Sequence, residues 1–326
     1  MGEVRGFALA GGLGLGLGLL YALTAQALFR ARRMARYLDA MSRGFLLGVP
    51  GALGLLTAWG ALGWHRLPVG VALALPAVAC LLLVGLLLAL RRETPLTLLM
   101  ALPLCLVAAS LGGALGTLLA RSGLPRAALV ALVGAGLLAP FALAAVEHRR
   151  RIVVVRGERR ASIAIAADRA TIWRNIIRVP PIGARERRSS LFTLVGIPRP
   201  CQATLSHEGL GGVRTGIFER GITFRETIVE WHEEQDLRFT FQVDRSVPVP
   251  APLGAIGGPH FDIEQVAYRL EALPDGRTRL HLTCRDRIST PFNGYANLWL
   301  GAIMGDFQRA ILRVIKARCE ANEPGS

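Results

Sequence analysis

The sequence predicts an α+β protein: a bundle of five membrane-spanning helices, then a domain of antiparallel strands closed by one long helix. The first observation is composition. Hydrophobic residues make up 52% of the 326 residues and charged residues only 19%, where a globular protein has about 25%. The second is position: before residue 150 charges cluster between long apolar runs, and after it they are dispersed among short alternating segments. We therefore expect a membrane region over 1–148 and a water-exposed domain after it.

Five apolar runs define the predicted spans, because each is near or above the ~20 residues needed to cross the hydrocarbon core of a bilayer. They cover residues 6–29, 44–64, 68–90, 95–120 and 127–147. Ionisable residues lie only at the ends of these runs, which argues against an ion or proton pathway through them. We expect the spans to anchor the chain or contact lipid, and any chemistry to lie in the second half.

The arginines that flank the spans predict the topology. Ten lie in the first loop, in the third loop or directly after the last span: Arg30, Arg32, Arg33, Arg36, Arg43, Arg91, Arg92, Arg149, Arg150 and Arg151. The other flanks carry only Arg5, Arg66, Arg121 and Arg126. Positive charge favours the cytoplasmic side. We therefore expect a multi-pass protein of the inner (cytoplasmic) membrane, with its N-terminus outside and its C-terminal domain in the cytoplasm.

The first span carries two glycine pairs at GxxxG spacing, Gly12 with Gly16 and Gly14 with Gly18. Such pairs let two helices approach closely. Gly12 and Gly16 are therefore candidates for a homodimer contact, and a glycine-leucine segment that faces lipid is the alternative.

After a basic linker over 149–160, the pattern predicts seven strands separated by turn residues. They are expected at 161–166, 201–206, 213–219, 222–231, 237–243, 262–272 and 278–288. Asp168 can cap a helix over 169–178, and a short helix or loop with a basic patch follows over 182–190. The long loop 246–260 is rich in proline and glycine, and it is either a lid or a passive connector.

One long helix is expected over 293–320, before a short tail, 321–326. Its apolar residues recur every three or four positions and define one face. They are Tyr295, Trp299, Ile303, Phe307, Ile311 and Val314.

Residues 160–320 resemble the START-like superfamily, also called the SRPBCC or polyketide cyclase/dehydrase group. The resemblance is carried by Ser162 to Asp168 with Ile172-Trp173, by Glu230-Trp231, and by Tyr268 to Glu271 before the turn Pro274-Asp275-Gly276. It implies a helix-grip fold, in which a curved antiparallel sheet wraps around the C-terminal helix and a hydrophobic cavity lies between them. Members bind lipids, sterols, polyketides, plant hormones or aromatic substrates, and some are enzymes, but they share no catalytic motif.

Alternation along the strands gives the residues that we expect to line this cavity. The apolar ones are Phe239 and Phe241 from one strand and Trp299, Ile303 and Phe307 from the helix. The polar ones, which would orient a ligand, are Arg214, Arg225, Tyr268 and Arg285. A closed core is the alternative, in which Arg214 and Arg225 pair at the surface with glutamates of neighbouring strands, Glu219, Glu226 and Glu230.

Three residues are candidates for acid and base chemistry: His260, Asp262 and Tyr268. His260 and Asp262 are two residues apart and would share a face of a strand, as an acid/base pair or half of a metal site. No third ligand is evident, the five cysteines have no metal spacing, and nucleotide and cofactor motifs are absent from the sequence. We therefore predict no metal and no cofactor, and an ordinary loop histidine remains the alternative.

Together these features predict a membrane-anchored protein that binds or transfers a hydrophobic ligand, a lipid or an isoprenoid. The alternatives are a cyclase- or dehydrase-like enzyme that uses cavity residues, and a regulatory or scaffold membrane protein. The expected partners are membrane lipid and a hydrophobic small molecule. Nucleic acid is not expected, because the 25 basic residues of 151–326 are interspersed with 19 acidic ones, for a net charge of only +6 (25 − 19).

Overall fold

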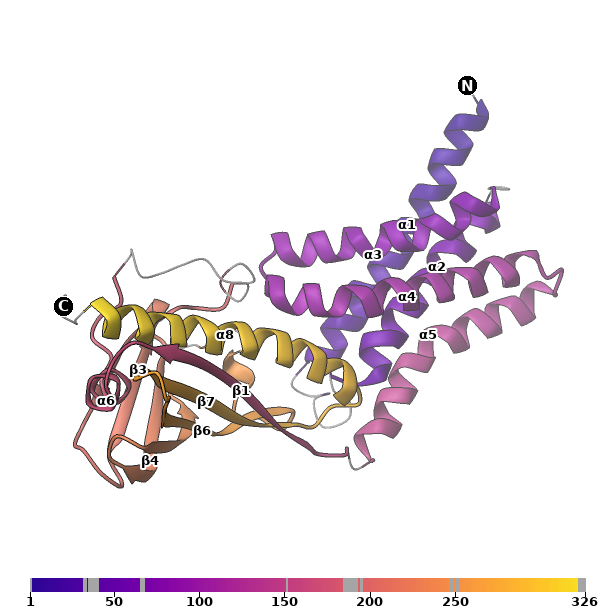
Figure 1. The fold of residues 1–326 in the computed structure, drawn as a ribbon. Helices are drawn as coiled ribbons and strands as arrows, with labels where there is room; N and C mark the ends of the chain where they lie inside the picture. Colours follow the sequence, from indigo (N-terminus) through magenta and orange to yellow (C-terminus); the bar gives the residue numbers. More distant parts are fainter. Residues whose placement is uncertain are drawn as a thin grey trace. The chain divides into compact units, whose positions relative to one another are not determined.

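Five long helices and a seven-stranded sheet appear in the computed structural model, which describes residues 2–31, 34, 41–64, 68–150, 152–183, 193, 196–246, 249 and 253–321 (Figure 1). The chain divides into two units, Met1–Ile152 and Val153–Ser326. The first unit is helical, and the second holds the whole sheet.

The helices of the first unit confirm the five predicted apolar segments. They are α1 (Gly2–Arg30), α2 (Val49–Trp64) with a π-helical turn η1 (Gly44–Gly48) before it, α3 (Val69–Ala89), α4 (Pro95–Arg121) and α5 (Arg126–His148). All five are long and apolar enough to cross a membrane.

Small residues bring the backbones of α2 and α4 into contact. A Cβ added at Gly112 would collide with the backbone of Gly51, and one added at Gly116 would collide with that of Leu55. Glycine is therefore required where these two helices cross, and small residues play the same role between closely packed membrane helices.

The two glycine pairs of α1 lie in different surroundings. Gly14 and Gly18 are buried against α2, where an added Cβ would collide with Thr57. Gly12 and Gly16 are exposed, and nothing described lies within 4 Å of a Cβ built on either. The first pair therefore serves packing within the chain, and the homodimer contact through the second pair stays a prediction.

This difference predicts opposite outcomes for matched substitutions in α1. Gly14→Leu should destabilise the helical unit by about 1–3 kcal/mol, because the new side chain overpacks the contact with α2. Gly12→Leu should leave the packing of α1 on α2 within one chain unchanged, because nothing in the described part of that chain lies within 4 Å of the added Cβ. Size-exclusion chromatography of Gly12→Leu and Gly16→Leu tests the homodimer, which both substitutions should dissociate.

The second unit is an antiparallel sheet with a long helix on one face. Its elements are β1 (Val155–Ile165), α6 (Arg169–Ile177), β2 (Pro200–Leu205), β3 (Val213–Phe218), η2 (Glu219–Gly221), β4 (Thr223–His232), β5 (Asp236–Val243), η3 (Leu253–Ala255), β6 (Phe261–Ala272), β7 (Thr278–Ile288) and α8 (Asn293–Ala321). The strand order is β1-β7-β6-β5-β4-β3-β2, and every pair is antiparallel. Figure 1 shows α8 running along the sheet, as expected for a helix-grip fold.

Polar side chains fasten α8 to β1 and β7. The amide of Gln308 donates from Nε2 to the carbonyls of Arg159 (3.1 Å) and Leu282 (3.2 Å). Further along, Lys316 Nζ donates to Ala164 O at 2.8 Å. Because these acceptors are backbone carbonyls of the sheet, they fix the helix along the strand direction.

The buried face of α8 differs from the predicted one. Its fully buried residues are Gln308, Leu312, Ile315 and Cys319, rather than the predicted continuation through Ile311 and Val314. The buried face is shifted by one position from the predicted one, from Phe307, Ile311 and Val314 to Gln308, Leu312 and Ile315, while Ile311 packs half-buried against the core. The shift buries the amide of Gln308, which donates to two carbonyls of the sheet.

The linker is also shorter than predicted, because β1 already begins at Val155. The residues expected in a linker up to 160 instead pair along β7, with Arg159 opposite Cys284. Segment 184–190, which includes the predicted basic patch, and the tail from 322 lie outside the described residues. The described part of the long loop packs on the sheet through buried Ile256.

Candidate functional site

Two apolar clusters fill the face of the sheet that α8 covers. The first includes Trp173, Phe239, Leu282 and Leu312. The second is aromatic: Phe224 contacts Phe218 and Phe241, both at ring-centroid distances of 4.7 Å, and Phe218 stacks on Phe307 of α8 at 6.2 Å. This face is therefore packed by side chains from the sheet and from α8.

A buried ion pair lies where the two clusters meet. Glu226 of β4 is flanked on its own face by Phe224 of the second cluster and Ile228 of the first. Opposite it on β3, Arg214 donates from Nη1 to Glu226 Oε2. Their side chains are only 8% and 7% exposed. Two opposite charges thus sit inside an otherwise apolar interior.

The surroundings of this pair are aromatic. The guanidinium carbon of Arg214 lies 5.5 Å from the ring centre of Phe239, within cation–π range. Glu226 Oε1 lies 3.2 Å from the position that a Cβ would take at Gly216, so this glycine leaves room for the carboxylate. The buried ring of Tyr268 packs near Phe239, with centroids 6.2 Å apart.

Burial controls the protonation of these groups. It raises the pKa of the Glu226 carboxyl, and the charge of Arg214 partly opposes that rise. It also raises the pKa of Tyr268 to about 12, so the phenol keeps its proton at neutral pH. The site therefore offers a guanidinium and a neutral hydroxyl as donors and one carboxyl group as acceptor.

Three buried polar atoms of this unit have no hydrogen-bond partner in the described part of the chain: Arg214 Nε, Gln308 Oε1 and Trp173 Nε1. Buried polar atoms without partners are uncommon in folded proteins, and each needs an explanation. Arg214 Nε matters most, because it belongs to the buried ion pair and is free to donate.

The structure brings together five of the nine predicted ligand-binding residues on the inner face. Arg214, Phe239 and Tyr268 are buried, and Phe241 and Phe307 are half-buried in the aromatic cluster. Trp299 and Ile303 are half-buried on the first turns of α8.

Arg225 and Arg285 are exposed and lie on the outer face of the sheet, contrary to their prediction as cavity residues. The register explains this, because Arg225 alternates with buried Phe224 and Glu226 along β4. Arg285 likewise alternates with buried Cys284 and Asp286 along β7.

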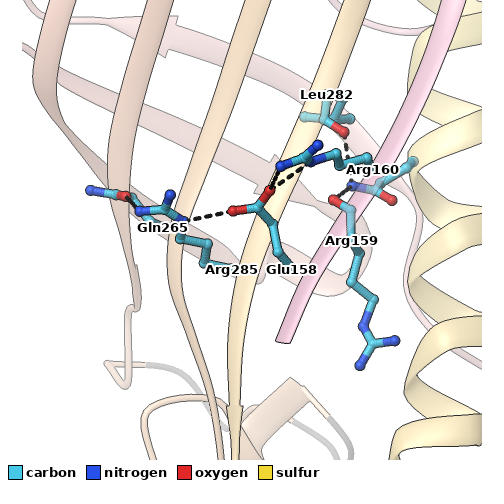
Figure 2. A network of polar contacts seen from close by, with 7 residues as sticks. Glu158, Arg159, Arg160, Gln265, Leu282 and Arg285 are labelled. Atoms are coloured by element: carbon cyan, nitrogen blue, oxygen red, sulfur yellow. Dashed lines mark hydrogen bonds and ion pairs between the residues drawn. The ribbon is translucent and has the colours of Figure 1, made fainter. Parts of the chain in front are cut away.

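The outer face has a hollow of about 860 Å³ of its own, lined by charged side chains. Figure 2 shows part of this lining, where Glu158 accepts hydrogen bonds from Arg160 at 2.6 Å and Arg285 at 2.9 Å. Arg285 also donates to Gln265 at 3.4 Å. Hydrogen bonds from Arg285 and Arg160 lower the pKa of the Glu158 carboxyl. These residues form a polar network open to solvent, which does not suit an apolar ligand.

The three acid/base candidates, His260, Asp262 and Tyr268, do not form one cluster. His260 Nδ1 lies 2.9 Å from Ser289 O, at the end of the loop before β6. Asp262 pairs in register with Arg287 at the start of β6. Tyr268 faces the interior, near the ion pair. Within the described residues, no group of three or more His, Cys, Asp or Glu side chains gathers as a metal site would require.

Glu226 is a residue of the site that the sequence did not predict. Pairing of Arg214 with Glu226 was considered only as a surface contact, whereas the structure buries it. Alternation could have located it, because Glu226 lies two residues from Phe224 and from Ile228, and residues so spaced share a face.

No protein-family model and no curated protein matches the chain. Among solved structures, a truncated norcoclaurine synthase of Thalictrum flavum is 11% identical, covering 54% of this chain and 99% of its own, with a TM-score of 0.34. The Zhui aromatase/cyclase of a Streptomyces species is 15% identical, covering 52% and 98%, with a TM-score of 0.36. An uncharacterised protein of Rhizobium leguminosarum is 11% identical, covering 52% and 98%, with a TM-score of 0.33. Sequence identities and TM-scores this low carry no information about the ligand or reaction of this chain.

Proposed function

We propose that this chain binds a hydrophobic ligand, a lipid or an isoprenoid, inside a START-like helix-grip domain that five spans tether to the inner membrane. The domain lies on the cytoplasmic side and the N-terminus outside. The observation that carries the proposal is the buried Arg214–Glu226 pair with its unpartnered Nε.

A buried ion pair adds little to stability, because the loss of hydration offsets most of the attraction between the charges. Arg214 and Glu226 therefore need a reason other than stability, and perturbed buried charges are frequent at functional sites. A ligand oxygen bonded to Arg214 Nε would satisfy the donor that the protein leaves unpaired.

The ligand chemistry follows from the neighbours of the pair. Arg214 and Tyr268 would hold one polar end, such as a hydroxyl or carbonyl oxygen. The aromatic cluster around Phe224 and Phe241 would contact an apolar body. Tethering gives such a site a high effective concentration of membrane lipid, so a modest affinity suffices.

Extraction of bound lipid from the purified full chain tests this proposal. The spans also carry lipid, so the informative comparison is with the double variant Arg214→Met/Glu226→Leu, which removes the polar pair at similar volume. Mass spectrometry should detect one species that is stoichiometric in the native chain and in exposed-face Arg225→Leu but absent from the double variant. Identical lipid profiles of all three proteins would refute the proposal.

A cyclase- or dehydrase-like enzyme is the second candidate, favoured by the protonated phenol of Tyr268 near the carboxyl of Glu226. Burial raises the pKa of both groups, so the phenol is a proton donor and the carboxylate of Glu226 is a proton acceptor for a bound substrate. Tyr268→Phe separates the two functions. A binding protein should retain most of its ligand, whereas an enzyme should accumulate unconverted substrate, which the same mass spectra would identify.

A further inference from the structure

Exposed apolar side chains gather at one end of the second unit, where the chain enters β1 and where α8 begins. Val153 is 73% exposed and Val154 47%, and Leu298 on the second turn of α8 is 72% exposed. Single exposed apolar residues are ordinary, but several at one end of a domain mark an interaction surface.

A hydrogen bond links the two segments. Asn293, the first residue of α8, donates from Nδ2 to Val153 O at 2.7 Å. Tyr295 and Trp299 follow on α8 and are half-buried, with ring centroids 6.4 Å apart. The entry to β1 and the first turns of α8 therefore form one end of the unit, with two aromatic rings at its surface.

The short segment between α5 and β1 limits how far Val153 can lie from the end of α5. Helix α5 ends at His148, and Val153 is five residues later. Five extended residues span at most roughly 17 Å. If α5 crosses a bilayer, Val153 must stay within that distance of the point where the helix leaves it. The exposed Arg149 and Arg150 lie in between and suit anionic headgroups.

We infer that Val153, Val154 and Leu298, flanked by Tyr295 and Trp299, form a membrane-docking surface whose occupant is the phospholipid interface of the bilayer. The inference rests on the membrane tether of the proposed function. Tyrosine and tryptophan favour this interface, where an apolar ring body and a polar edge are both accommodated. Docking directs the start of α8 at lipid, and Phe307 of the aromatic cluster lies nine residues, or roughly 14 Å, beyond Leu298 along this helix.

Photo-crosslinking of the full chain in nanodiscs tests the docking surface. The nanodiscs hold phosphatidylcholine and phosphatidylglycerol, with a trace of phospholipid carrying a diazirine near its headgroup. We expect lipid adducts on peptides that contain 152–155 and 295–299. Leu210 and Val229 are matched controls, because they are exposed apolar residues of the same unit (67% and 43%) outside this surface, and their peptides should remain unmodified.

The same crosslinking experiment is repeated with aspartate substitutions in the docking surface and at the control positions. Val153→Asp/Leu298→Asp should lower adduct yield on those peptides by roughly tenfold, because charged side chains are expelled from the interface. Leu210→Asp/Val229→Asp should leave the yield unchanged. Unchanged near-ultraviolet circular dichroism would show that both variants fold. Lipid adducts found only on the spans would overturn the inference. It would also be overturned if the peptides with Leu210 and Val229 gave the same adduct yield as those of the docking surface.

The two proposals fail separately in these experiments. A chain with adducts at the docking surface but no interior ligand contradicts the proposed function alone. A chain that retains its ligand but gives no adducts at this surface contradicts the docking inference alone. Failure of the chain to enter nanodiscs would overturn the tether, and both proposals with it.

Discussion

Glu226→Ala should lower the free energy of unfolding by about 3–5 kcal/mol, because it leaves the guanidinium of Arg214 buried without a counter-charge. The side chain of Arg214 is 8% exposed, so water cannot replace the lost carboxylate without opening the interior. Denaturant unfolding of the detergent-purified chain, followed by tryptophan fluorescence, measures the change. Arg225→Ala on the exposed face is the control and should shift the unfolding free energy by less than about 0.5 kcal/mol.

The double variant Arg214→Met/Glu226→Leu should recover most of that loss. Replacing a buried ion pair by apolar side chains of similar volume is often neutral or stabilising. A double variant as stable as the native chain would show that the pair is not retained for stability. If the double variant were as unstable as Glu226→Ala, the pair would be a structural element, and its burial would no longer support ligand binding.

Asp286→Ala is the second substitution with a large expected effect, a loss of about 3 kcal/mol. Asp286 is 1% exposed on β7 and accepts from Arg159 Nε at 3.0 Å and from Nη2 at 3.4 Å. Arg159 Nη2 also donates to Asn297 Oδ1 of α8 at 2.6 Å. The arginine thus connects β1, β7 and the start of α8, and losing its buried carboxylate removes the charge that balances it.

Asn297→Ala is the matched control for this substitution. Asn297 is exposed, so water can replace its amide, and the loss should be about 1 kcal/mol or less. The same denaturant experiment compares the two variants. Equal losses would mean that the contact with α8, and not the buried charge, carries the stabilisation.

Most of the sheet was predictable because its local pattern agrees with its tertiary environment. Strands β2 to β7 begin and end within one residue of the predicted limits. Alternation of apolar and polar residues marks such strands, and turns such as Pro274-Asp275-Gly276 separate them. The predicted cap of α6 is also present, with Thr171 N donating to Asp168 at 2.6 Å. The five apolar helices were equally predictable, because their length and hydropathy identify them.

The start of β1 was not predictable from local pattern. Residues 156–160 read as a basic linker because four of the five are charged. The strand forms because Arg159 turns inward to Asp286, which lies far away in the sequence. A charge that looks solvated locally thus becomes part of the interior only when its strand neighbour is known.

The same limit applies to the candidate site. Residue type suggested Arg214 and Tyr268 as polar groups for a cavity, and the structure places both inside. Residue type alone could not show that Glu226 is the buried partner of Arg214, or that Arg285 faces solvent. Both depend on the register of the strands. The chemistry of the side chains identifies candidate site residues, but the pairing of strands that are distant in sequence determines which of those residues come into contact.

The position of the ligand tests the central claim most directly. A cryo-electron microscopy or crystal structure of the full chain, purified with its lipid, should show elongated non-protein density between the two apolar clusters. One end of that density should lie within hydrogen-bonding distance of Arg214 Nε, and the rest along the Phe224 and Phe241 rings. A lipid-bearing chain whose interior is closed around Arg214 and Glu226, with density only on the spans or the outer face, would contradict the proposal.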